Sequence, residues 1–384
     1  MTISMKVFGS HKYSFQYPAK YVFKIVLVPE KVTTARGFHY VLLVDTSGSM
    51  EGFKIELARK GALELLNRIP EGNKVSVLSF GERVNLLAEA VNPTDASRAI
   101  QDLTAEGSTP FYSALLMAIS LVKKYEMPSY LILLTDGNPT DVTVLDNYKG
   151  LEFPSNVKVI AYGIGDDYNE VLLRLLADKT GGIFEHVSEV NEIVKLLPKA
   201  AVTKVGAQDV TVDIMDIKSE GQVKLFNFEG PPVRLNAVES AVTIWGELTL
   251  PGNHSGDILR VAVTYFDPAT QMQQTMSQVL SVQVASTMEQ YNAGIDKDLV
   301  AEYNYYVLLD KYGRDLSASN LGEATKTLNQ LTQLAQQTRR LDMMEQTKRL
   351  QNSLEQTRRL GSVEATKRLA KEVQSEVTKK LRST

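Results

Sequence analysis

The sequence contains no cysteine, and only four of its 384 residues are histidine. A chain without cysteine forms no disulfides, thiolate zinc sites or iron–sulfur clusters, and it has no cysteine nucleophile. The four histidines, at positions 11, 39, 186 and 254, are not spaced like the ligands of a metal. These absences exclude the metal and redox chemistry that depends on sulfur, and they disfavour a histidine zinc site.

Long apolar runs are also missing. The longest candidates, Tyr21–Val28 and Tyr130–Leu134, have the length of strands, whereas a membrane-spanning helix needs about 20 apolar residues. The first ten residues lack the basic and then apolar pattern of a signal peptide. We therefore expect a cytoplasmic protein that does not contact the membrane.

Charge is nearly balanced over the whole chain but unevenly distributed. The net charge is −3, yet residues 320–384 carry 13 Lys and Arg against 7 Asp and Glu. This balance excludes a strongly basic nucleic-acid binder as an interpretation of the whole chain. Aromatic residues are not interleaved with the basic ones in the tail, so nucleic-acid binding there is the least favoured possibility. An apolar content of 43% excludes a wholly disordered chain.

The hydrophobic pattern divides the chain into successive parts. Residues 38–199 alternate apolar strands with helical patterns, starting with the continuous apolar run Tyr40–Val44. This alternation predicts a doubly wound α/β domain with a parallel sheet covered by helices on both sides. Residues 200–290 switch to a period of two, which predicts an antiparallel β-sandwich.

The remaining segments are assigned relative to these two domains. Residues 1–37 are rich in strand formers, and we expect them to supply strands of the sandwich. The α/β domain would then be an insertion in the sandwich; the alternative is that residues 1–37 form a β-hairpin extension of the α/β domain. Residues 291–336 are predicted to be a helical segment, and 337–384 a basic tail that is helical or disordered.

Oxygen-bearing side chains follow two of the predicted strands. Asp45, Ser47 and Ser49 alternate directly after the strand that ends at Val44, and Asp136 follows the strand Tyr130–Thr135. The carboxyl ends of strands in a parallel sheet lie at one edge, so we expect these side chains to converge there. Thr109 lies between these two strands in the sequence, in the loop that leads into the helix predicted to start near Pro110. Carboxylates and hydroxyls suit a hard cation, which predicts Mg²⁺ or Mn²⁺.

The three motifs resemble the metal-ion-dependent adhesion site of the von Willebrand factor A (vWA) family. The resemblance rests on Asp45-x-Ser47-x-Ser49, Gly107-Ser-Thr109-Pro and Thr135-Asp136-Gly, in this order. It implies that Asp45, Ser47, Ser49, Thr109 and Asp136 are metal ligands, directly or through water. It also implies that an open coordination position takes a carboxylate from a partner protein. Two alternatives stay open. In the first, the serines cap the helix that follows them and Asp136-Gly forms a turn, without any metal. In the second, the metal site is intact but has a structural role and does not bind a partner.

Enzymatic motifs are not evident. No histidine lies near Ser47 and Ser49 in the motif to act as a base. The chain contains no phosphate-binding sequence of the G-x-x-x-x-G-K-[ST] type. We therefore expect that the protein is not an enzyme.

Five copies of the pattern Thr-(Lys/Arg)-(Lys/Arg)-Leu occur near the C-terminus. They begin at Thr338, Thr347, Thr357, Thr366 and Thr378. One interpretation is a solvated helix, because four copies place a Glu four residues before an Arg or Lys. The other interpretation is that the threonines are phosphorylated. A phosphothreonine followed by an aliphatic residue at the third position resembles the ligand of forkhead-associated (FHA) domains.

The combination of these parts resembles archaeal vWA proteins that pair with an FHA protein in archaellum (motility) repression. The resemblance implies a non-enzymatic scaffold, modified by a Ser/Thr kinase and a phosphatase, that regulates archaellum expression. The competing hypothesis is a vWA accessory subunit of an AAA-type ATPase, as in chelatase-like or MoxR-like assemblies. A surface adhesin is a third possibility, and the missing export signal disfavours it.

Overall fold

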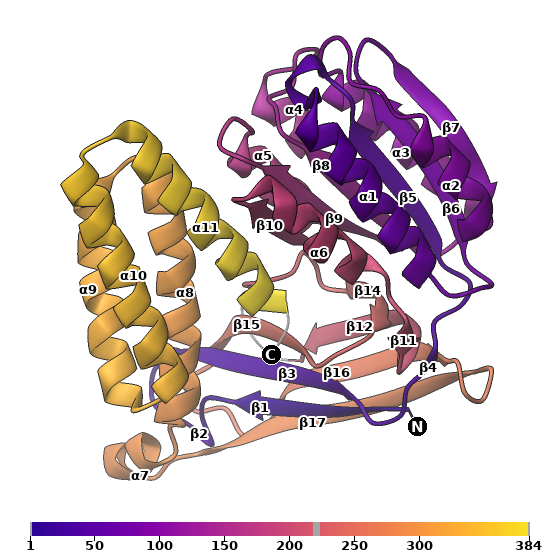
Figure 1. Ribbon diagram of the computed structural model, residues 1–384. Coiled ribbons are helices and arrows are strands. Elements are labelled where there is room, and N and C mark those ends of the chain that lie inside the picture. The colour runs from indigo at the N-terminus through magenta and orange to yellow at the C-terminus, as the bar shows by residue number, and fades with distance from the viewer. Residues whose placement is uncertain (1, 218–222, 383–384) are drawn as a thin grey trace.

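The computed structural model describes residues 2–217 and 223–382. The chain forms an α/β domain, a β-sandwich beneath it and a group of helices beside both (Figure 1). The predicted fold class is confirmed in all three parts.

The α/β domain is built on a six-stranded sheet in the order β10-β9-β8-β5-β6-β7. In chain order its strands are β5 (His39–Asp45), β6 (Lys74–Phe80), β7 (Val84–Val91), β8 (Ser129–Thr135), β9 (Val157–Ile164) and β10 (Ile183–Val187). All neighbours are parallel except β6 and β7, which are antiparallel. The prediction of a wholly parallel sheet is therefore wrong at β7. This edge strand is half-exposed or exposed throughout, so its sequence lacks the apolar run of a strand buried on both faces.

Helices cover both faces of this sheet, as in a doubly wound fold. The helices are α1 (Phe53–Arg68), α2 (Pro93–Gln101), α3 (Phe111–Tyr125), α4 (Leu145–Lys149), α5 (Glu170–Lys179) and α6 (Ile193–Leu196). The apolar side chains of α1, α2 and α6 pack on one face, against Tyr40, Leu42 and Val44 of β5. Those of α3, α4 and α5 pack on the other face, against Val41 and Leu43. Strand β5 is thus buried between two layers of helices.

The β-sandwich consists of two sheets of mostly antiparallel strands, packed around one core. One sheet has the order β1-β3-β15-β13, with β1 (Ile3–Gly9), β3 (Ala19–Pro29), β15 (Val242–Leu250) and β13 (Lys224–Leu225). The other has the order β14-β12-β16-β17-β2, with β14 (Val233–Val238), β12 (Ala207–Asp216), β16 (Gly256–Asp267), β17 (Met272–Val284) and β2 (Tyr13–Ser14).

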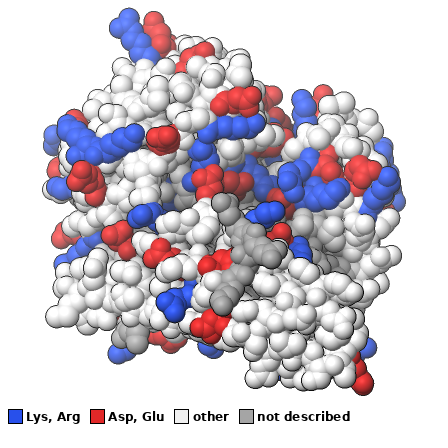
Figure 2. Space-filling view, turned by 180° about the vertical axis from the view of Figure 1, so that it is seen from behind, with Lys and Arg blue, Asp and Glu red and all other residues white. Residues whose placement is uncertain are grey.

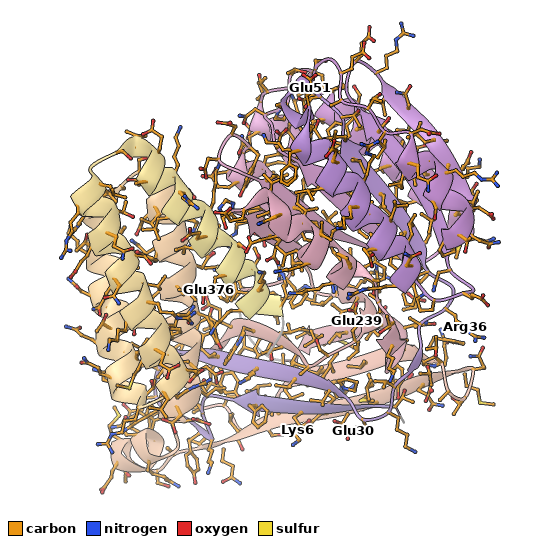
Figure 3. The ribbon with its side chains drawn as sticks, viewed as in Figure 1. Lys6, Glu30, Arg36, Glu51, Glu239 and Glu376 are labelled. Carbon is orange, nitrogen blue, oxygen red and sulfur yellow. The ribbon has the colours of Figure 1, made fainter. Side chains whose placement is uncertain are left out.

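The α/β domain is an insertion in this sandwich, because β3 precedes it and pairs with β15, which follows it. The two connecting segments run side by side, since β4 (Thr33–Thr34) pairs with β11 (Lys204–Val205). Glu239, labelled in Figure 3, lies between the two parts and accepts a 2.7 Å hydrogen bond from the hydroxyl of Tyr130. The insertion is thus fixed at its base by backbone and side-chain contacts.

The C-terminal part is wholly helical in the described residues. It contains α7 (Met288–Ala293), α8 (Lys297–Ser317), α9 (Leu321–Thr338), α10 (Leu341–Leu360) and α11 (Val363–Arg382). The last four share one apolar core, so α10 and α11 are packed helices and not a solvated tail. Figure 1 shows α11 between the other helices and β10 and α5 of the α/β domain.

The three parts meet around a cavity of about 570 Å³ lined by residues of α5, α8, α11 and the segment 226–229. Seen from behind, the molecule is hollowed near its centre, and acidic and basic side chains gather side by side there (Figure 2). Arg174 of α5 forms an ion pair with Asp310 of α8, and Arg382 of α11 lies 2.9 Å from Asp178 of α5. Ion pairs therefore join the helices to the α/β domain. Within 2–217 and 223–382, no helix has the length and apolar character needed to span a bilayer.

Candidate metal centre

Three loops meet at the carboxyl edge of the α/β sheet. Strands β5 and β8 are parallel neighbours, with Val44 opposite Leu134, so the residues that follow both strands leave the sheet together. The hydroxyl of Thr135 donates a 2.5 Å hydrogen bond to Oδ2 of Asp45. Glu51, labelled in Figure 3, follows the first loop and lies at this end of the domain, at the start of α1.

A chain of short hydrogen bonds connects the predicted ligands of the first and third loops. The backbone N–H of Ser47 donates to Oδ1 of Asp45 at 2.9 Å. The Oγ atoms of Ser47 and Ser49 are 3.0 Å apart, and Ser49 Oγ donates to Oδ1 of Asp136 at 2.7 Å. The structure thus brings four of the five predicted ligands together.

Thr109 of the second loop faces the same point. The N–H of Gly48 donates to the carbonyl of Gly107 at 3.0 Å, which joins the first and second loops. A Cβ atom at Gly137 would lie 3.5 Å from Thr109 Oγ1 and 3.7 Å from Ser49 Oγ. A side chain at position 137 would therefore be in van der Waals contact with both hydroxyls.

The two carboxylates are buried, while part of the rim is exposed. Asp45 and Asp136 have exposed fractions of 0% and 1%, whereas Gly48, Ser49 and Ser108 are exposed. Burial raises the pKa of Asp45 to about 6; the charge of Asp136 adds to this increase, and hydrogen bonds from Ser47 and Thr135 oppose it. Two carboxylates in such surroundings favour a bound cation.

Two contacts of this site were not foreseen from the sequence. Thr135 was part of the third motif, but its hydrogen bond to Asp45 was not predicted. Lys54, in the first turn of α1, forms an ion pair with Oδ2 of Asp136. No pattern in the sequence indicated Lys54, because its role depends on the reach of its side chain across the first loop.

The donor chemistry fits a hard divalent cation. Among the described residues, no group of three His, Cys, Asp or Glu side chains is arranged to hold a metal. A cation at this edge would therefore depend on hydroxyl as well as carboxylate oxygens, the kind of donor that Mg²⁺ and Mn²⁺ accept.

The repeated threonines of the C-terminal helices are mostly in the interior. Thr347, Thr357, Thr366 and Thr378 have exposed fractions of 3%, 7%, 6% and 1%. Thr338 is half-buried at the end of α9, where its hydroxyl donates to the carbonyl of Ala335 at 2.9 Å. The threonines are not gathered at a common surface.

The charged residues of the repeats are paired differently from the predicted pattern. Of the expected i,i+4 pairs, Glu355 and Arg359 are 3.9 Å apart. Arg349 of α10 instead lies 3.8 Å from Glu376 of α11, which is labelled in Figure 3. Arg368 pairs with Glu372 at 3.7 Å. The interpretation as a solvated helix is therefore wrong, because these helices pack in a shared core. Some of the expected ion pairs within a helix are replaced by ion pairs between helices.

Helix α11 contacts the α/β domain mainly through polar groups. The hydroxyl of Thr378 accepts from the N–H of Phe184 at 3.3 Å and donates to its carbonyl at 3.0 Å. The buried Lys371 donates to the carbonyls of Asp166 and Tyr168 at 2.6 and 3.0 Å. The edge strand β10 is thus covered by side chains of the last helix.

Two family models match this chain. Residues 41–199 match the von Willebrand factor type A domain, and residues 297–383 match "Archaellum regulatory network B, C-terminal domain". The crystal structure of the ArnB paralog VWA2 from Sulfolobus acidocaldarius is 27% identical and covers 100% of this chain and 98% of its own, with a TM-score of 0.83. The match over residues 297–383 and the structure of this paralog both include the C-terminal helices, so the similarity is not confined to the α/β domain.

Other similar proteins share the fold or only part of the chain. A von Willebrand factor type A protein from Catenulispora acidiphila is 16% identical, with a TM-score of 0.71 over 91% of this chain and 89% of its own, and shows the fold alone. An uncharacterized protein of Synechocystis sp. is 26% identical over 299 residues, which are 66% of this chain and 67% of that protein. Further curated relatives are matched over less than a fifth of their own length.

Proposed function

We propose that this chain, with its von Willebrand factor type A domain and its archaellum regulatory network B C-terminal domain, is a non-enzymatic scaffold that binds its partners through two sites. Its similarity to the ArnB paralog supports a role in the archaellum regulatory network through protein interactions. The finer proposal is that it regulates archaellum expression through a metal-dependent site and a phosphothreonine site.

The first site is the cation site at the edge of the α/β sheet. Mg²⁺ or Mn²⁺ would be held by Asp45, Ser47, Ser49, Thr109 and Asp136, directly or through water. The observation that carries this proposal is the hydrogen-bonded series from Ser47 through Ser49 to Asp136. When bound, the cation would supply a positive centre for a carboxylate of a partner protein. The exposed rim at Ser49 and Ser108 leaves room for such a carboxylate to approach.

The hydrogen-bond partners of the four histidines lie away from the site serines, which supports a non-enzymatic role. His39 and His186 are hydrogen-bonded to Ser76 and Tyr168 inside the α/β domain. The remaining two histidines belong to the sandwich region, where His11 bonds Ser10 and His254 bonds a backbone carbonyl. The site serines are therefore suited to bind a cation and not to attack a substrate.

The second site is in the C-terminal helices, and Thr338 fits it best. The segment from Thr338 to Leu341 connects α9 and α10, Thr338 is half-buried, and Leu341 is 74% exposed. A kinase could reach this threonine with little opening of the helices, and an FHA-domain partner could bind both the phosphate and the leucine. The other four threonines are buried, and a phosphate adds a charge of about −1.5 to −2. Phosphorylation of those four would require that α10 or α11 first separate from the bundle.

Affinity capture with the full chain tests both sites. Protein from the native host is treated with or without phosphatase, and the captured partners are identified. Capture of an FHA-domain protein that is lost with phosphatase and with Thr338→Ala, but not with the exposed control Thr249→Ala, supports the phosphothreonine site. Absence of phosphate from all five threonines in phosphopeptide mapping would contradict it. Capture of an AAA-type ATPase regardless of phosphatase would favour the accessory-subunit alternative.

The metal site needs a separate comparison. We expect Asp136→Ala to lose both Mn²⁺ binding and the capture of at least one partner, while the exposed control Asp146→Ala retains both. If Asp136→Ala lost the metal but kept every partner, a role of the site in partner binding would be wrong.

A further inference from the structure

Lys54 places a positive charge next to one of the two buried carboxylates of the metal site. Its ammonium group forms an ion pair with Oδ2 of Asp136. The Asp136 side chain has no exposed surface, while 31% of the Lys54 side chain is exposed. Gly52, with a φ of +75°, turns the chain into α1 just before Lys54. The lysine therefore reaches into the site from its rim.

The two carboxylates of the site differ in their partners. Asp45 accepts hydrogen bonds from neutral groups, the N–H of Ser47 and the hydroxyl of Thr135. Asp136 accepts one from the neutral hydroxyl of Ser49 and one from the ammonium group of Lys54. Both oxygens of Asp136 are thus occupied, and one of the two negative charges is compensated by a group of the protein itself.

We propose that Lys54 competes with the divalent cation for Asp136 and so lowers the metal affinity of the site. This inference rests on the proposed metal site. A divalent cation among the site oxygens is attracted by two carboxylates and repelled by the ammonium group, and the repulsion is strong at the low effective dielectric of a buried site. Because Lys54 is partly exposed, its ammonium group can withdraw into water when a cation binds.

The test is Mn²⁺ binding by the full-length, metal-free chain, followed by electron paramagnetic resonance of free Mn²⁺. Lys54→Met retains the stem and removes the charge, and we expect it to bind Mn²⁺ about tenfold more tightly than wild type, the effect of losing one charged hydrogen bond of modest strength. Lys54→Arg retains the charge and is expected to stay close to wild type. Lys60→Met makes the same change at an exposed position of α1 and should leave the affinity unchanged.

The outcomes separate this inference from the metal site itself. If wild type binds Mn²⁺ and Lys54→Met binds it equally or more weakly while melting at the same temperature, Lys54 is no competitor and the inference is wrong. If neither wild type nor Lys54→Met binds Mn²⁺, the proposed metal site fails and the inference fails with it. Tighter binding by Lys54→Met but not by Lys60→Met supports the inference.

Discussion

The contact between Thr378 of α11 and the edge strand β10 gives the sharpest prediction about how the helices are held. Phe184 is in the edge strand of the sheet, so its N–H and carbonyl have no neighbouring strand on that side. The hydroxyl of Thr378 accepts from this N–H at 3.3 Å and lies 3.0 Å from this carbonyl; its one hydrogen is shared with the carbonyl of Ser375 at 2.9 Å. Both residues are buried, with exposed fractions of 0% and 1%. The hydroxyl thus takes the place of a neighbouring strand.

The substitution Thr378→Val nearly preserves the shape of the side chain and removes both bonds. A buried backbone group left without a partner costs about 1–3 kcal/mol, and this is the loss that we expect in the free energy of unfolding. Thr378→Glu should be more disruptive, because it buries a charge without a partner. We expect α11 to leave β10 in that variant, as it would after phosphorylation of Thr378.

Amide hydrogen exchange in peptides that cover β10 measures this contact directly, and urea unfolding measures its energy. Exchange at Phe184 should be faster in Thr378→Val and faster still in Thr378→Glu. Thr249→Val changes an exposed threonine and should alter stability by less than about 0.5 kcal/mol. If Thr378→Val differed no more than this control and left exchange in β10 unchanged, the hydroxyl would not protect the edge strand.

Three further predictions concern other parts of the α/β domain. Burial lowers the pKa of His39 from 6.5 to about 4, and the charge of Glu89 opposes this shift only in part. Between pH 6.5 and pH 4 the unfolded chain therefore binds more protons than the folded chain. The free energy of unfolding should fall as the pH drops through this range, by at most about 1.4 kcal/mol per pH unit. Urea midpoints for wild type and His39→Phe at pH 7 and pH 5 check this, and an equal pH dependence of both would contradict it. Gly137→Ala places a methyl group in van der Waals contact with two site hydroxyls and should weaken Mn²⁺ binding in the same resonance assay without lowering the melting temperature; unchanged affinity would contradict it. Arg174→Met breaks the buried ion pair with Asp310 and should lower the free energy of unfolding in urea by about 3 kcal/mol. This is the low end for a buried pair, because Arg314 remains beside Asp310. A loss below about 1 kcal/mol would count against this network.

The α/β domain was predictable because its strands are buried on both faces and its helices alternate with them. Every residue of β5 is buried, and such a run is recognisable without knowledge of its neighbours. Strand β7 was missed because it lies at the edge, where Asn85 and Glu89 interrupt the apolar pattern. A sequence pattern detects burial, and an edge strand has little of it.

The candidate site was predictable to the extent that strand ends determine it. Parallel strands place Asp45 and Asp136 at one edge, so their proximity follows from the topology. The ion pair of Lys54 does not follow, because it depends on the rotamers of a long side chain and on the turn at Gly52. Whether the site binds a cation stays a prediction that Mn²⁺ binding must test.

The C-terminal helices were the least predictable part, because their sequence is poor in apolar residues beyond 336. Each helix nevertheless needs only a narrow apolar stripe to join a shared core. In α10 this stripe consists of Met343, Leu350 and Leu354. A low average apolar content therefore did not exclude packing.

The threonine repeat has a physical explanation that a sequence pattern alone could not separate from recognition by a partner. Residues three apart lie on one face of a helix, so the threonine and the leucine of a repeat can point inward together, as Thr347 and Leu350 do. The copy at Thr357 departs from this, because its threonine is buried while Leu360 is 71% exposed. A buried threonine is tolerated there because its hydroxyl donates to a carbonyl in its own helix, that of Met343 at 2.8 Å for Thr347. The two basic residues between them then point outward. An FHA domain would require the same threonine and leucine at the same spacing, so only exposure distinguishes the two uses, and exposure favours the copy from Thr338 to Leu341.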